Sequence, residues 1–188
     1  NKRFPFDPAA SKKLLAEAGY ANGFETGMDC PTDRYVNDEQ ICQAVVAMLA
    51  KIGIKVNLLA QTRAKYFAKI LEPSFQTSFY MLGWTPTTYD AHNMLLNLVQ
   101  TRNKETHAGE NNLGGYSNPA IDNLIGKVLI ETDQEKRTDL VHQALKMVKD
   151  DFAYIPLHQQ AVVWAAKSNV DLVQPADNYF PLRYVNVR

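Results

Sequence analysis

Two short stretches of the sequence carry side chains that could hold a ligand. The first follows the apolar run 79–82 and contains Trp84, Thr87, Tyr89 and Asp90. An aromatic ring can stack on a ligand, a hydroxyl group can hydrogen-bond to it, and a carboxylate can pair with a cationic group. The alternative interpretation is that Trp84 belongs to the hydrophobic core and that an ordinary loop follows it.

The second stretch, Arg34 and Tyr35, follows a predicted strand at 24–28. The guanidinium group of Arg34 could bind an anionic end of a ligand. In an open α/β sheet, the carboxyl ends of parallel strands meet at one edge, and ligand sites lie just outside that edge. We therefore predict that Arg34 and Tyr35 share a ligand-binding face with the residues that follow position 82.

Residue patterns typical of catalysis are absent from the sequence. It has no GxSxG nucleophile motif, no GxxxxGK[ST] phosphate-binding loop and no GxGxxG dinucleotide fingerprint. Asp90 and His92 lack further ligand-spaced partners, so neither a metal site nor a cofactor is predicted.

Two alternatives to a ligand-binding domain stay open at this stage. One is a hydrolase or transferase domain that uses Asp33, Asp90 or a histidine. Because nothing in the sequence assembles a nucleophile, a base and an orienting group, we predict that the chain is not an enzyme. The other alternative is an interaction or sensing module.

Composition excludes further classes of function. The 188 residues are 46% hydrophobic, which is enough to fill the core of one ordinary domain or large lobe. Lys and Arg together equal Asp and Glu together at 20 each, and this balance argues against nucleic-acid binding. No apolar stretch approaches the length of a membrane helix. The start has neither an initiator Met nor the apolar region of a signal peptide, so we expect a piece of a longer precursor.

Hydrophobic periodicity predicts alternating helices and strands in the first half of the chain. Asp7 with Pro8 begins a helix that Gly19 ends, and Asn37 with Gln40 resembles a capping box for a second helix. The predicted strands are 24–28, 54–58 and 76–82, and the predicted helices begin near residues 8, 38 and 66. This order predicts an α/β fold with a mixed, mostly parallel sheet covered by helices.

The second half of the chain is predicted to be mainly helical. Residues 97–115 are polar and rich in Gly and Asn, and we interpret them as a long surface loop. Asn118 with Pro119 begins one helix, and a further helix begins near Asp133. Short strands are predicted at 155–157 and 161–165, and an irregular tail from residue 170.

The two cysteines, Cys30 and Cys42, do not form a CxxC motif and have no histidine cluster near them, which argues against zinc. They could be two small buried side chains. They could also form a disulfide between the end of a strand and the following helix, which would indicate an oxidising compartment.

Several short motifs, in this order and spacing, resemble the C-terminal half of the family 5 extracellular solute-binding proteins, the dipeptide- and oligopeptide-binding components of ABC importers. The motifs are Phe6-Asp7-Pro8, Lys13-Leu14-Leu15-Ala16-Glu17-Ala18-Gly19-Tyr20, Ile52-Gly53-Ile54-Lys55-Val56, Gly83-Trp84, Gly115-Tyr116-Ser117-Asn118-Pro119 with Asp122, and Ile155-Pro156-Leu157. The resemblance covers nearly the whole chain.

The resemblance implies one lobe of a type II periplasmic-binding-protein fold, in which two lobes enclose a ligand. Residues 1–188 would be the second, C-terminal lobe, with the first lobe and the signal peptide outside this chain. The resemblance further implies a periplasmic monomer that delivers a small polar or peptide-like ligand to the membrane subunits of an ABC permease. An extracytoplasmic location favours the Cys30–Cys42 disulfide.

The resemblance also assigns a role to Trp84, which matches the aromatic residue of the family's ligand site. In peptide-binding members, an Asp three residues after this Trp pairs with the α-amino group of the peptide. Thr87 stands at that position here and brings no charge, so the charge-assisted contact is missing. Other members of the family take up nickel complexes, opines, sugars and other small solutes.

Overall fold

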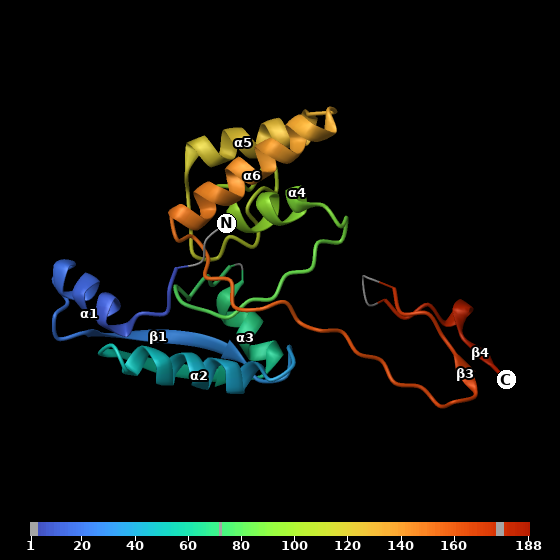
Figure 1. The fold of residues 1–188 in the computed structure, drawn as a ribbon, viewed down its shortest axis with the longest axis horizontal. Coiled ribbons are helices and arrows are strands. Elements are labelled where there is room, and N and C mark those ends of the chain that lie inside the picture. The colour runs from blue at the N-terminus through green and yellow to red at the C-terminus, as the bar shows by residue number, and fades with distance from the viewer. Residues whose placement is uncertain (1–3, 72, 176–178) are drawn as a thin grey trace. The chain divides into compact units, whose positions relative to one another are not determined.

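The computed structural model describes residues 4–71, 73–175 and 179–188. The chain divides into two compact units. Unit 1 consists of Asn1–Gly83 and Glu110–Tyr116, and unit 2 consists of Trp84–Gly109 and Ser117–Arg188. Figure 1 shows the elements of both units.

Unit 1 begins with helix α1, Pro8–Glu17. As predicted, Asp7 caps the helix: its carboxylate accepts a hydrogen bond from the Ala10 amide at 2.9 Å. Gly19 follows the helix with a φ of +89°, a left-handed conformation that glycine adopts without steric cost. Residues next to the helix, Asp7 and Gly19, are therefore sufficient to predict where it begins and ends.

The centre of unit 1 is a parallel pair of strands, β1 (Phe24–Pro31) and β2 (Ile54–Gln61). Helix α2, Asp38–Ala50, connects them and packs against both strands (Figure 1). Parallel neighbours need such a crossover connection, so the predicted β-α-β order is confirmed here. The core between the helix and the strands contains Met28, Cys30, Cys42, Ile54, Val56 and Met81.

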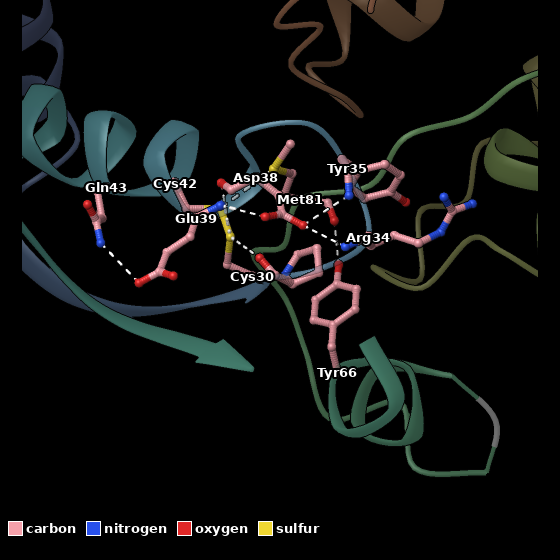
Figure 2. Close-up of a disulfide and its surroundings, with 10 residues drawn as sticks. Cys30, Arg34, Tyr35, Asp38, Glu39, Cys42, Gln43, Tyr66 and Met81 are labelled. Atoms are coloured by element: carbon pink, nitrogen blue, oxygen red, sulfur yellow. Dashed lines mark hydrogen bonds between the residues drawn. A yellow bond between two sulfur atoms is a disulfide. The ribbon is translucent and has the colours of Figure 1, made fainter. Parts of the chain in front are cut away.

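Cys30 and Cys42 are bonded to each other in this core, with their Cα atoms 6.5 Å apart (Figure 2). Both residues are fully buried. The bond joins the end of β1 to the second turn of α2, the two elements between which residues 32–37 run. It therefore fixes the two ends of the loop that carries Arg34 and Tyr35.

Helix α3, Arg63–Ile70, places Tyr66 and Ile70 in a second cluster together with Leu113. The Tyr66 hydroxyl donates a hydrogen bond to the carbonyl oxygen of Met81. Burial raises the pKa of the Tyr66 phenol, so this side chain stays neutral and acts as a donor.

The predicted strand at 76–82 is wrong over most of its length. It makes a single parallel bridge, in which the Asp29 amide donates to the Phe79 carbonyl at 2.9 Å and the Met81 amide donates to the Asp29 carbonyl at 3.1 Å. The residues before it bond to the end of α3 instead, as in the 3.0 Å bond from the Gln76 amide to the Lys69 carbonyl. Local bonding to the helix therefore replaces a strand ladder.

The predicted capping box at Asn37 and Gln40 is also wrong. Asn37 has a φ of 57° and its side chain makes no capping hydrogen bond. Asp38, the first residue of the helix, makes the hydrogen bonds instead, and its exposed fraction is only 2%. Its carboxylate accepts from the amides of Arg34 at 2.9 Å, Tyr35 at 3.0 Å and Glu39 at 2.9 Å (Figure 2).

Helical segments form a large part of the described residues of unit 2. They include α4 (Ala91–Met94), the π-helix Leu95–Val99, α5 (Pro119–Ile130) and α6 (Gln134–Asp150). The predicted starts of α5 and α6 are confirmed, since the side chains of Asn118 and Asp133 accept from backbone amides in the first turns. Helices α5 and α6 pack side by side (Figure 1). Their buried residues include Ile121, Ile125, Val128, Ala144 and Val148.

The prediction of a surface loop at 97–115 is wrong at several positions. Residues 95–99 form the π-helix, and Leu98, Val99, Ala108, Asn112 and Leu113 are buried. Asn112 satisfies its amide group locally, donating to the Tyr116 carbonyl at 2.6 Å and accepting from the Tyr116 amide at 2.9 Å. A side chain that bonds to its own loop in this way makes burial of a polar segment possible.

The strands predicted at 155–157 and 161–165 are wrong, because neither segment pairs with a strand among the described residues. The tail is more regular than predicted. Strand β3 (Val170–Asp171) pairs antiparallel with β4 (Asn186–Val187), and a 3-10 turn at Leu182–Tyr184 lies between them in sequence. Within residues 4–71, 73–175 and 179–188, no helix is both long and apolar enough to cross a membrane.

Candidate ligand-binding site

Trp84 begins unit 2 and is half-buried. Its indole nitrogen donates a hydrogen bond to the side-chain oxygen of Asn93 at 3.0 Å. The tryptophan is thus outside the fully buried core, but its hydrogen bond holds the ring in one orientation. A partly exposed ring with a fixed edge is suited to stacking on a ligand.

Thr87 is exposed, and the same Asn93 side chain reaches it. The amide nitrogen of Asn93 donates to the Thr87 hydroxyl oxygen at 3.5 Å, the long end of the hydrogen-bond range. Asn93 was not among the predicted site residues. Its position in the helix that follows the predicted stretch was the only signal for it in the sequence.

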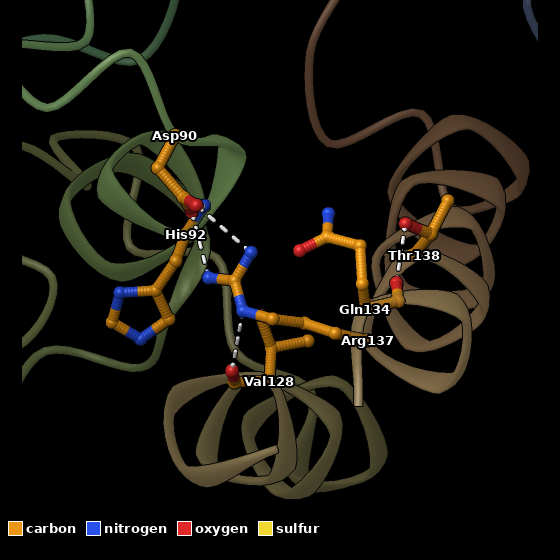
Figure 3. A network of polar contacts seen from close by, with 6 residues as sticks. All are labelled: Asp90, His92, Val128, Gln134, Arg137 and Thr138. Atoms are coloured by element: carbon orange, nitrogen blue, oxygen red, sulfur yellow. Dashed lines mark hydrogen bonds and ion pairs between the residues drawn. The ribbon is translucent and has the colours of Figure 1, made fainter. Parts of the chain in front are cut away.

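Asp90 was predicted to offer a carboxylate to a ligand, and the structure pairs it with Arg137 of α6. The two guanidinium nitrogens lie 2.8 and 2.9 Å from the two carboxylate oxygens (Figure 3). Asp90 also caps α4 by accepting from the His92 amide at 2.7 Å. The hydrogen bond from Arg137 lowers the pKa of the Asp90 carboxyl, and burial only partly opposes this shift. Asp90 is therefore charged and already paired.

His92 lies beside this pair and is half-buried (Figure 3). Burial lowers the pKa of its imidazole, and the charge of Asp90 partly offsets that effect. Across the part of the chain that the structure describes, no three or more His, Cys, Asp or Glu side chains gather as a metal-binding group would.

Tyr89 is 61% exposed and has a φ of 55°, a left-handed conformation that is uncommon for an aromatic residue. Its amide donates to the Pro86 carbonyl at 3.2 Å, which closes a turn after Trp84. The turn presents the Tyr89 ring to solvent.

Arg34 and Tyr35 belong to unit 1, in the loop between β1 and α2. Asp38 holds their backbone amides, as described above. The Arg34 guanidinium is exposed and lies over the Tyr35 ring, 4.9 Å from its centroid (Figure 2). The loop therefore displays a cation beside an aromatic ring.

Tyr35 also explains the glycine before Trp84. The Tyr35 hydroxyl donates to the Gly83 carbonyl at 3.4 Å. A Cβ atom at position 83 would lie 2.7 Å from the Tyr35 ring, which is closer than real side chains approach. Only glycine leaves room for the ring in this position.

Asp33, a candidate acid in the enzymatic alternative, has a structural role. Its carboxylate accepts a hydrogen bond from the Arg63 amide at the start of α3. Thr62, the residue at the N-cap position of that helix, makes no side-chain cap bond, so Asp33 serves in its place.

Comparison with known proteins decides the family. The sequence model of the bacterial extracellular solute-binding proteins, family 5 (middle region), matches residues 1–106. The chain belongs to this family. Among its relatives, heme-binding protein A of Haemophilus influenzae is 32% identical over 157 residues, which are 82% of this chain and 28% of that protein. The glutathione-binding protein GsiB of Escherichia coli is 29% identical over 173 residues, 90% of this chain and 33% of that protein.

Solved structures of periplasmic and dipeptide-binding proteins are similar to this chain. The periplasmic binding protein DppA of Helicobacter pylori, in complex with the peptide STSA, matches with a TM-score of 0.71 and 27% identity, over 83% of this chain and 29% of that chain. A Pseudoalteromonas dipeptide-binding protein in complex with Met-Leu matches with a TM-score of 0.68 and 27% identity, over 79% of this chain and 29% of that chain. The predicted type II periplasmic-binding-protein fold is confirmed.

This family 5 chain spans 28% to 33% of the length of the relatives that it matches. Its predicted site residues fall into two groups. Trp84, Thr87, Tyr89 and Asp90 come together in unit 2, where Asn93 and Arg137 hold three of them. Arg34 and Tyr35 come together in unit 1.

Proposed function

We propose that this chain is part of the substrate-binding component of an ABC importer, which captures a small polar or peptide-like ligand between two lobes and delivers it to the membrane permease. Residues 1–188 would form most of the second lobe. The protein would act as a periplasmic monomer without catalysis. Affinity would come from a hinge closure that buries the ligand.

One observation carries this proposal. Trp84 is half-buried and its indole edge is fixed by Asn93, in a chain that belongs to a family of solute-binding proteins. A fixed, partly exposed aromatic ring suits a ligand site, where aromatic side chains line the pocket. Trp84 would stack on the ligand, Thr87 and Tyr89 would contact it, and Arg34 with Tyr35 would hold an anionic end.

The relatives indicate what kind of ligand to test. Their names and complexes include heme, glutathione, the peptide STSA and Met-Leu. The pairing of Asp90 with Arg137 and the uncharged Thr87 leave the segment 84–90 without an unpaired carboxylate. We therefore favour a ligand that presents neutral or hydrogen-bonding groups to Trp84 over one that presents a free ammonium group there.

The Cys30–Cys42 disulfide supports the extracytoplasmic location, since disulfides persist in oxidising compartments. The enzymatic alternative loses support because Asp33 caps a helix and Asp90 is paired with Arg137.

Native mass spectrometry of the full-length protein, purified under non-denaturing conditions, tests the proposal. We expect a retained small molecule that Trp84→Ala releases, with a loss of about 2 kcal/mol or roughly thirtyfold in Kd for the ligand identified. Trp164→Ala is the matched control and should retain the ligand. Equal retention by both variants, or turnover of the retained molecule, would contradict the proposal.

A further inference from the structure

The side-chain amide of Asn93 bonds to two predicted site residues, Trp84 and Thr87. Its oxygen lies 3.0 Å from the Trp84 indole nitrogen, and its nitrogen lies 3.5 Å from the Thr87 hydroxyl oxygen. The indole N–H can only donate, so the Asn93 oxygen must face Trp84. The amide nitrogen then necessarily points toward Thr87, where the hydroxyl oxygen can accept.

Asn93 is itself held by the rest of unit 2. It lies in α4, whose first turn is capped by Asp90. Arg137 binds Asp90 with both terminal nitrogens and donates from Nε to the Val128 carbonyl at 3.1 Å, which ties α4 to α5 and α6 (Figure 3). Asn97 adds a bond of 2.7 Å from its side-chain nitrogen to the Asn93 carbonyl.

We propose that Asn93 is the positioning residue of the ligand site: it fixes the indole plane of Trp84 and the hydroxyl of Thr87, and it does not contact the ligand. This inference rests on the proposed function. Without Asn93, the Trp84 ring can change rotamer and its N–H must bond to water. The cost of ordering the ring is then added to ligand binding, and affinity falls.

The first readout is the indole N–H of Trp84 in the ¹⁵N-labelled full-length protein, assigned by its loss in Trp84→Phe. In Asn93→Ala we expect the resonance to move toward the position of a free indole and its exchange with water to accelerate at least tenfold. In Asn93→Asp the oxygen acceptor remains, so slow exchange should persist. Asn123→Ala, the same substitution at an exposed position of α5, is the matched control and should also exchange slowly.

The second readout is affinity of the full-length protein for two probes, glutathione and the peptide STSA, measured by calorimetry. For a probe that the wild type binds, Asn93→Ala should raise Kd about tenfold and Asn123→Ala should not. Unchanged indole exchange in Asn93→Ala would overturn the inference. So would faster exchange with unchanged Kd, which would make Asn93 merely structural.

The two readouts separate this inference from the proposed function. If the wild type binds neither probe, the proposed ligand class fails. The inference about Asn93 then stands or falls on the indole exchange alone, because that readout needs no ligand.

Discussion

The two stretches predicted to contact a ligand are held in different ways. After β1, the Asp38 carboxylate binds the backbone amides of Arg34 and Tyr35, while the Arg34 side chain is exposed. At the start of unit 2, the Asn93 amide binds the side chains of Trp84 and Thr87. The first arrangement fixes the path of the chain, and the second fixes the groups that would meet a ligand.

The exposed side chain of Arg34 is free to change conformation, whereas the side chains of Trp84 and Thr87 are already ordered before a ligand arrives. A side chain that is already ordered loses little conformational entropy when a ligand binds, whereas an exposed arginine loses more. Trp84 should therefore contribute mainly to affinity. In the proposed function, Arg34 would be able to adjust to ligands of different length or charge. Substitutions in the two stretches should accordingly affect stability and binding in different proportions.

The largest expected change in the free energy of unfolding concerns the loop that carries Arg34 and Tyr35. Asp38→Ala removes a buried carboxylate that accepts from three amides, and hydrogen bonds to a charged group are the stronger kind. We expect a loss of about 3 kcal/mol in the free energy of unfolding, measured by urea denaturation. Glu39→Ala in the same turn should cost far less, and equal losses in the two variants would contradict the role given to Asp38.

The next effect concerns Gly83, which the Tyr35 ring approaches closely. Gly83→Ala forces the ring to move and should cost about 1.5 kcal/mol, as overpacking does. Much of the cost should disappear in the Tyr35→Ala background, since the clash is with that ring. Gly27→Ala is the control, because a Cβ there meets nothing within 4 Å. A similar loss at positions 27 and 83 would argue against the close approach.

A smaller, pH-dependent effect is expected for the ion pair between Asp90 and Arg137. Arg137 lowers the pKa of Asp90 in the folded state, so the pair stabilises the fold above the unfolded-state pKa of about 4 and loses this contribution as the pH falls through the lowered pKa. Because both side chains are partly exposed, at 24% and 36%, Asp90→Asn should cost only about 1 kcal/mol at pH 7.

Denaturation curves of the wild type and Asp90→Asn between pH 7 and pH 2.5 check this prediction. The difference in unfolding free energy should shrink toward zero at the acid end. A difference that is constant with pH would show that the charge of Asp90 is not the cause.

The smallest effect on stability is expected for Arg34→Ala. Its side chain is exposed, so the free energy of unfolding should change by no more than about 0.5 kcal/mol. If the proposed function holds, binding of an anionic ligand should nevertheless weaken, and calorimetry on the full-length protein measures this. A large loss of stability would mean that Arg34, like Asp38, mainly holds the loop.

Features set by neighbouring residues were predictable from the sequence. Asp7, Asn118 and Asp133 each cap the helix that directly follows, and each was found from its position alone. The β-α-β order followed from hydrophobic periodicity, and the family and its fold followed from short motifs.

Features set by distant residues were not predictable. The pairing of Asp90 with Arg137 joins positions 47 apart, and no pattern links them. The segment 76–82 could bond either to a neighbouring strand or to the end of α3. The Gln76 amide bonds to the Lys69 carbonyl of α3, so most of the expected strand does not form. One local detail was also missed: Asn37 is the N-cap residue of α2, as expected, but its side chain makes no capping bond, and the buried Asp38 accepts the amides.

The disulfide also has a practical consequence for following ligand capture. It uses both cysteines of the chain, and neither sulfur is accessible to reagents because both residues are fully buried. A cysteine substituted for the exposed Tyr89 would therefore be the one reactive thiol among these 188 residues. A fluorescent label attached there would sit a few residues from Trp84, where it could report the arrival of a ligand in real time.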